Sequence, residues 1–191
     1  KRNTLRTTWY RLIRNANFSP VLSQCKMVMQ EISQEQIMKT LEGVMDPEVP
    51  VLSVLDLGVI RDVKIRKSDV EIDISPTYTG CPAMDVISSS VKNAILSIGV
   101  NKVKVNTVLT PPWTTDWISE AGRKKLEDFG IAPPQQNSKI KRELFEAAQK
   151  VPCPKCKASD TSCVSLFGST ACKALYKCNV CLEPFDYFKC L

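Results

Sequence analysis

The most informative absence in this sequence is histidine, which occurs nowhere among its 191 residues. Without an imidazole no mixed Cys/His metal site can form, so a cysteine-based metal site must be made of cysteines throughout. A cysteine hydrolase is also disfavoured, because its nucleophilic thiol would have no histidine as general base.

Long apolar runs are lacking as well. No stretch approaches the roughly twenty residues that cross a membrane, and no short apolar core with a small-residue cleavage site marks a secretory signal. We therefore expect a soluble, cytoplasmic chain without a membrane partner. In that compartment thiols stay reduced, and clustered cysteines bind metal more often than they form disulfides. The odd total of nine cysteines agrees with this expectation.

Acidic residues are absent from the first thirty positions, which carry six Lys or Arg. These six account for the whole net charge of +6, since residues 31–191 hold twenty basic and twenty acidic side chains. The neutral body argues against nucleic acid as a partner. We expect residues 1–29 to be a basic leader, disordered or not native, with Met29 as a candidate start. A basic arm or a transit-like peptide is the alternative.

Hydrophobic periodicity predicts a small domain over residues 30–132. Ser33 and Gln36 form a capping box at the start of a helix, and Asp46-Pro47 should end it. Apolar and polar residues then alternate with period two, which predicts a hairpin of two strands with its turn at 67–69.

The second half of this domain continues with a loop and a helix that starts at Pro82 and stops at Gly99. Alternation over 100–109 predicts a third strand, and the helical crossover makes it parallel to the second. A last helix should run from about Thr115 to Phe129. The order α-β-β-α-β-α predicts an α+β fold with a three-stranded mixed sheet.

Seven cysteines fall within the last thirty-nine residues, after a polar linker over 133–150 with a short helix at 141–150. Two C-x-x-C pairs stand twenty-one residues apart, and a hairpin can set two such turns around one tetrahedral ion. We expect residues 151–191 to be a zinc ribbon, because about forty residues are too few to fold without a stabilising cross-link such as a metal ion. The four expected ligands of this structural Zn²⁺ are Cys153, Cys156, Cys178 and Cys181.

Other interpretations of these cysteines remain open. An iron–sulfur cluster also takes four thiolates, and a redox C-x-x-C is disfavoured because two pairs are present and neither follows a βαβ pattern. Cys163 is best interpreted as a buried, unreactive thiol. Cys172 and Cys190 are candidate additional ligands, members of a second site or core thiols.

Cys81 stands alone in the α+β domain, directly before the expected helix start at Pro82. The positive end of the helix dipole favours a thiolate there, and Gly80 lets the backbone turn. Asp46 and Glu48 lie in another loop, which Pro47 and Pro50 stiffen. The plainer alternatives are a turn residue for Asp46 and a small buried hydrophobe for Cys81.

Three stretches carry a resemblance to a known family: "DPEVPVLSVLDLGVI", "PTYTGCPAMD" and "LTPPWTTDWISEAGRKKLEDFGIAPP". They resemble the iron–sulfur cluster assembly domain family. The stretches "FGSTACKALYKC" and "CLEPFDYFKC" make the chain similar to the D-subunit family encoded with the phenylacetyl-CoA epoxidase (ring-1,2-monooxygenase) complex of aerobic phenylacetate catabolism. The resemblance covers about residues 30–191.

The resemblance implies an accessory, non-catalytic role in this aromatic degradation system. Such a protein would assist assembly of an iron–sulfur or di-iron centre in a partner subunit of the epoxidase complex. The complex's own di-iron subunit needs histidine and carboxylate ligands on long helices, and this chain has no histidine. Asp46, Glu48, Thr79 and Cys81 match the family's pocket motifs, where iron or a transient iron–sulfur cluster would be handled. A purely structural subunit, or a nucleic-acid-binding zinc-ribbon protein, is the alternative.

Overall fold

The computed structural model of the chain describes residues 32–134 and 151–189. The chain divides into two units, 1–30 and 31–191, and all described residues belong to the second. Our expectations for the basic leader, for a helix at 141–150 and for Cys190 lie outside the described residues. None of the helices in the described ranges is long and apolar enough to cross a membrane.

Helix α2, Gln34–Glu42, begins at the predicted capping box: Ser33 Oγ accepts from Gln36 N–H, and the Gln36 side chain accepts from Ser33 N–H. The predicted end at Asp46-Pro47 was wrong, because the helix stops at Gly43. Val44 leaves the helical path and its carbonyl accepts from Val54 N–H at 2.9 Å. Asp46 therefore lies in a loop, where its carboxylate can accept hydrogen bonds from backbone N–H groups.

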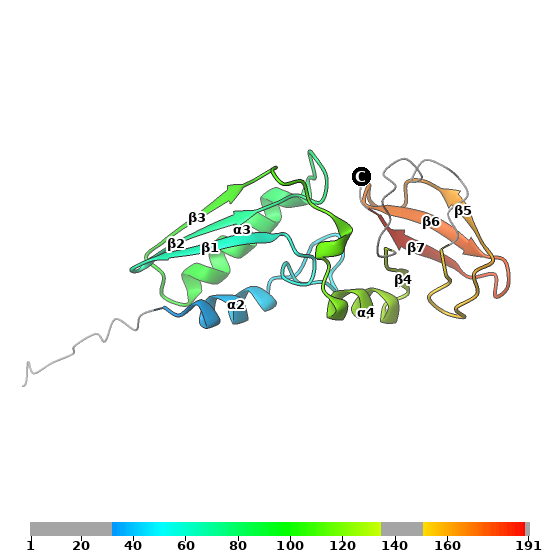
Figure 1. Ribbon diagram of the computed structural model, residues 1–191, viewed down its shortest axis with the longest axis horizontal. Coiled ribbons are helices and arrows are strands. Elements are labelled where there is room, and N and C mark those ends of the chain that lie inside the picture. Colours follow the sequence, from blue (N-terminus) through cyan, green and yellow to red (C-terminus); the bar gives the residue numbers. More distant parts are fainter. Residues whose placement is uncertain (1–31, 135–150, 190–191) are drawn as a thin grey trace, which may run out of the picture. The chain divides into compact units, whose positions relative to one another are not determined.

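The sheet of the α+β domain has the order β1-β2-β3, and Figure 1 shows α3 running along it. Strands β1, Ile60–Arg66, and β2, Asp69–Ile74, form the predicted antiparallel hairpin. Strand β3, Lys102–Thr107, pairs parallel to β2. Helix α3, Ala83–Ser97, supplies the crossover and buries Ile87, Val91 and Ile95. The predicted mixed three-stranded sheet is thus confirmed.

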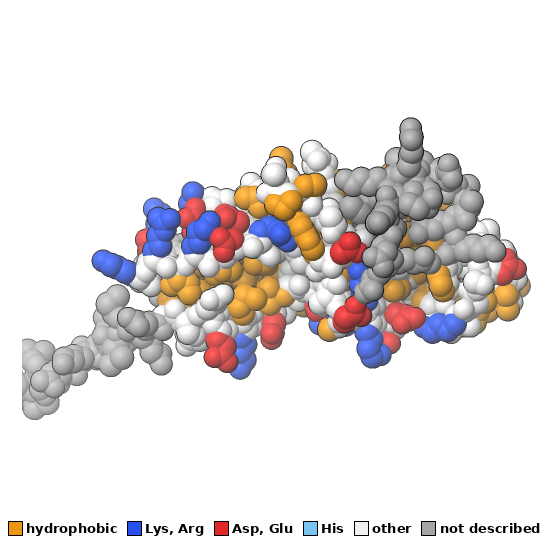
Figure 2. Space-filling view, viewed as in Figure 1, with side chains coloured by type: hydrophobic (Ala, Val, Ile, Leu, Met, Phe, Trp, Pro, Cys, Tyr) orange, Lys and Arg blue, Asp and Glu red, His pale blue; other side chains and the backbone are white. Residues whose placement is uncertain are grey.

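Charges on the exposed side of this sheet alternate in sign rather than forming a basic face. Lys64 Nζ lies 3.0 Å from Asp73 Oδ2, and Lys104 Nζ lies 3.0 Å from Glu71 Oε1. Figure 2 shows these acidic and basic side chains interleaved over β1–β3. Such pairing leaves little net positive potential for a phosphate backbone.

The predicted single helix from Thr115 to Phe129 was wrong. The segment forms a 3-10 turn, η1, Thr115–Trp117, and then a separate helix α4, Glu120–Asp128. Ser119 divides them because its Oγ accepts from Gly122 N–H at 2.9 Å and donates to Asp56 Oδ1 at 3.0 Å. The cap and the contact with a distant carboxylate fix the start of α4 at this residue.

Gly58 is a position where the fold requires glycine. Its φ is +70°, and an added Cβ would overlap the carbonyl oxygen of Trp117 and lie 2.8 Å from the Trp117 Cβ. We expect Gly58→Ala to lower the free energy of unfolding by about 3 kcal/mol or more, from left-handed strain and overlap together. Gly99→Ala is the matched control, because Gly99 has φ +90° with open space around its Cβ position. The free energy of unfolding is measured by urea denaturation. Equal losses for Gly58→Ala and Gly99→Ala would contradict a contribution from the overlap with Trp117.

A second sheet has the order β4-β7-β6-β5. Its elements are β4, Ile131–Ala132; β5, Thr161–Ser165; β6, Lys173–Cys178; and β7, Pro184–Phe188. The short strand β4, which the sequence pattern did not reveal, pairs parallel to β7. The sheet of the ribbon therefore includes two residues that we expected at the end of the α+β domain.

The two sheets also share buried side chains. Phe188 of β7 is 1% exposed and belongs to the main apolar cluster of the α+β domain. Its ring meets that of Trp113 edge-on, with centroids 6.3 Å apart, while Trp113 Nε1 donates to the Leu57 carbonyl at 3.0 Å. A smaller cluster around Tyr176, Phe185 and Tyr187 belongs to the ribbon itself.

Candidate metal centre and cysteine pocket

The paired cysteines of the ribbon lie on two tight turns. In the first, Lys157 N–H donates to the Cys153 carbonyl and Cys153 N–H to the Ala158 carbonyl, both at 2.9 Å. In the second, Cys181 N–H points at Cys178 Sγ at 3.4 Å. Lys157 and Leu182, each directly after the second cysteine of its pair, both adopt positive φ, 63° and 65°. Each turn thus bends its two thiols toward the same side.

The four thiols converge on one point. Cys153 Sγ lies 3.7 Å from Cys181 Sγ, and Cys156 Sγ lies 3.5 Å from Cys178 Sγ. All four sulfur atoms lie within 4.8 Å of one another. A tetrahedron of sulfurs at about 2.3 Å from a central zinc has edges of about 3.8 Å, so the arrangement fits Zn²⁺. Lys155 and Glu183, one beside each turn, form an ion pair at 2.9 Å.

Cys163 and Cys172 stand apart from this group. Cys163 packs against the small apolar cluster of the ribbon but is only half-buried, and its lack of reactivity stays a prediction. Cys172 is buried in the main cluster of the α+β domain, with its Sγ 3.3 Å from Glu48 Oε2. Burial raises the pKa of the Cys172 thiol to about 12, and the Glu48 carboxylate adds to this.

Asp46 makes the contacts of a turn residue. Its Oδ1 accepts from Glu48 N–H at 2.8 Å and from Val49 N–H at 2.7 Å. Burial raises the pKa of the Asp46 carboxyl, although these two backbone bonds act in the opposite direction. The carboxylate therefore holds the loop that presents the Glu48 side chain.

Cys81 lies at the predicted place, between Gly80 with φ +81° and the first turn of α3. Burial raises the pKa of its thiol, and the Glu48 and Asp46 carboxylates raise it further, against a backbone hydrogen bond from Ala83. From the sequence we expected a thiolate at Cys81, because the start of the helix was the only nearby feature that the sequence revealed. The structure adds burial and two acids, which raise the pKa of this thiol instead of lowering it.

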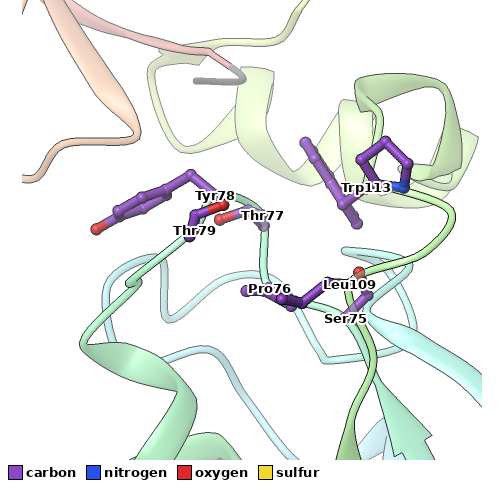
Figure 3. Close-up of a pocket in the computed structure, with 8 residues that line it drawn as sticks. Ser75, Pro76, Thr77, Tyr78, Thr79, Leu109 and Trp113 are labelled. Atoms are coloured by element: carbon purple, nitrogen blue, oxygen red, sulfur yellow. The ribbon is translucent and has the colours of Figure 1, made fainter.

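Thr79 lines a pocket to which Cys81 does not contribute. A pocket of about 170 Å³ is lined by residues 75–79, Leu109, Pro112 and Trp113, and Cys81 is not among them. In Figure 3, Tyr78 points away from Trp113, with Thr77 and Thr79 between them. The Asp46 and Glu48 carboxylates both act on the Cys81 thiol, while Thr79 lines the pocket beside Tyr78.

The sequence did not point to Tyr78 or Lys173, and it pointed to Cys172 only as a candidate additional ligand, a member of a second site or a core thiol. Tyr78 forms a hydrogen bond with the Cys81 thiol, Cys172 reaches Glu48, and Lys173 Nζ donates to the Glu48 carbonyl at 2.9 Å. Cys172 and Lys173 lie 124 and 125 residues from Glu48. No local pattern could have revealed those two contacts.

A small α+β domain that carries a four-cysteine β-ribbon defines the class of protein, and comparisons with known proteins define it further. Residues 34–107 match the model of the iron-sulfur cluster assembly protein family, and residues 137–189 match that of the PaaD zinc beta ribbon domain. A protein of Escherichia coli (strain K12), named as the D-subunit of a 1,2-phenylacetyl-CoA epoxidase, is 42% identical over 82% of this chain and 92% of its own length.

More distant relatives match about half of the chain. The Fe-S protein maturation auxiliary factor YitW of Bacillus subtilis (strain 168) is 37% identical over 51% of this chain and 97% of its own length. A solved DUF59 domain from Bacillus anthracis is 30% identical, covers 48% of this chain and 89% of its own, and has a TM-score of 0.46. The chain belongs to the D-subunit family of 1,2-phenylacetyl-CoA epoxidase systems, in which an iron–sulfur cluster assembly domain is joined to a PaaD zinc β-ribbon.

Proposed function

We propose that the chain is a non-catalytic maturation factor of a phenylacetyl-CoA epoxidase system in the cytoplasm. It assists assembly of an iron–sulfur or di-iron centre in a partner subunit. The observation that carries the proposal is the neighbourhood of Glu48 and Cys81, a carboxylate and a thiol in the domain that this family shares with Fe-S maturation factors. Thiol and carboxylate donors suit iron as a cargo.

In this proposal the ribbon holds one structural Zn²⁺ through Cys153, Cys156, Cys178 and Cys181. Four thiolates close the tetrahedral shell and leave no position for a substrate, so this ion stabilises the fold and performs no chemistry. The iron centre is cargo and belongs to the partner, whereas the zinc is resident.

The test compares the other epoxidase subunits expressed with and without this chain. We expect them to assemble in both cases, but to contain much less iron and to show little turnover when the chain is absent. Full iron content and turnover without the chain would contradict the maturation role.

A second candidate is a purely structural subunit that holds the oxygenase together. It is favoured by large apolar side chains exposed on the ribbon: Val164, Phe167, Val180 and Leu182. In the same experiment this role predicts that the complex falls apart without the chain, whereas the maturation role predicts an assembled complex that lacks iron.

A further inference from the structure

Strand β1 forms one edge of the three-stranded sheet. Within the described residues it is paired with β2 alone, so one side of its backbone is open. The hairpin turn shows which groups face that side. Residues 67–68 form a two-residue loop between Arg66 and Asp69, and the pair that closes such a loop is hydrogen-bonded. Because hydrogen-bonded and non-hydrogen-bonded pairs alternate, Val63 and Ile65 direct their N–H and C=O groups away from β2.

The Asp62 side chain confirms the direction of this free edge. Its Oδ1 accepts from Val63 N–H at 2.9 Å, which requires that this N–H does not point at β2. Its Oδ2 lies 3.2 Å from Lys64 Nζ. Both charged side chains are about half exposed, 54% for Asp62 and 46% for Lys64. The carboxylate thus bonds, from its own strand, an N–H that the carbonyl of an added strand could bond instead.

The inner, apolar face of β1 is incompletely covered. Val63 and Ile65 are only partly buried, whereas their neighbours on β2, Ile72 and Val70, are 0% and 2% exposed. Helix α3 packs against β3 and α2, which leaves the outer strand of the sheet with less cover. Figure 2 shows apolar side chains along the border of the charged region of the sheet. An added strand would therefore bury apolar surface as well as pair backbone groups.

The charges on the outer face of β1 favour a second copy of the same strand as its partner. In an antiparallel pair centred on Val63, Asp62 of each copy stands opposite Lys64 of the other, so two pairs of opposite charge form. Val63 then faces its own counterpart, and the outward N–H and C=O groups of the two make a hydrogen-bonded pair. Centring the pair on Lys64 or Ile65 would instead oppose Lys64 to itself or to Arg66.

The other edge of the sheet, β3, lacks this self-complementarity. Its charged side chains are Lys102 and Lys104, so no register of two β3 strands pairs opposite charges. Its inner residue Val103 is already buried, at 6% exposure, and α3 packs against this strand. Strand β1 is therefore the edge that a second copy fits.

We propose that two copies of the chain associate through antiparallel pairing of β1 about Val63, which joins their sheets into one sheet of six strands. On association, the Val63 carbonyl of one copy replaces the Asp62 carboxylate on the Val63 N–H of the other, and the released carboxylate turns to the facing Lys64. Lys64 can keep its bond to Asp73 of its own chain, because an ammonium has three donors. The interface is isologous, since both copies contribute the same strand. The dimer does not depend on the maturation role.

Sedimentation equilibrium of the full, zinc-loaded chain tests this dimer. We expect a dissociation constant on the order of 10 μM, so that wild-type chain is mainly dimeric at about 100 μM. Asp62→Lys opposes lysines at both pairs and Lys64→Asp opposes aspartates, so each variant alone should weaken dimerisation about ten-fold or more. An equimolar mixture of the two variants should restore the dimer, because each chain then meets the opposite charge. Lys102→Asp, a matched change on β3, should dimerise as wild type.

Amide hydrogen exchange of the wild-type chain is a second measurement, which depends on no variant. The N–H groups of Val63 and Ile65 should exchange more slowly as the chain concentration rises, whereas the outer N–H groups of β3 should not change. The proposal is overturned if wild-type chain stays monomeric at about 100 μM, or if the mixed variants dimerise no better than either alone. Open-ended oligomers would also overturn it, because they indicate pairing of β1 with β3 of the next copy.

Discussion

Cys178→Ser is expected to release the zinc of the ribbon, about one ion per chain, and to unfold residues 151–189 while the α+β domain stays folded. A serine hydroxyl keeps its proton at neutral pH and is a poor ligand for Zn²⁺. Structural zinc sites bind with about 10–16 kcal/mol, which is folding energy for a module this small. Elemental analysis measures the zinc, and near-UV circular dichroism reports the packed rings of Tyr176, Phe185 and Tyr187.

Cys163→Ser is the control for this experiment, because Cys163 is a ribbon cysteine outside the four-thiol group. It should keep the full zinc content. Retention of full zinc by Cys178→Ser would show that Cys163, Cys172 or Cys190 replaces it as a ligand. A loss of structure in the α+β domain as well would show that the contact between Trp113 and Phe188 couples the two modules more strongly than we expect.

Cys81→Ser is expected to abolish most of the maturation activity and to change stability by roughly 1 kcal/mol or less, because the hydroxyl preserves size and hydrogen-bonding capacity. Handling of a soft metal should not survive the change, since it requires a thiolate. The variant is expressed with the other epoxidase subunits, and iron content and substrate turnover are measured together.

Three outcomes distinguish the roles of Cys81. Normal activity would make Cys81 a core residue and rule out its thiolate as the carrier of function. A fall in activity with folding and partner binding intact supports maturation. Loss of partner binding itself would instead favour the structural-subunit role.

Asp46→Asn is the companion variant, because its amide oxygen can still accept the two backbone hydrogen bonds that hold the Glu48 loop.

The sequence alone determined the features that depend on neighbouring residues. The capping box at Ser33 and Gln36 started α2 as expected, and period-two alternation located β1 and β2. The C-x-x-C pairs gave the four thiols that the structure brings within 4.8 Å. In each case the controlling interactions run over a few residues, so spacing carries the information.

Only the tertiary structure decided the features that depend on distant partners. Ser119 divides the segment from Thr115 to Phe129 because it bonds Asp56, and α2 stops at Gly43 because Val44 pairs with Val54. The pKa of Cys81 is raised because folding buries the thiol and brings two carboxylates near it, and these effects together outweigh the favourable helix end. Cys172 meets Glu48 across 124 residues. Burial and long-range contacts are created by the fold, and no local pattern encodes them.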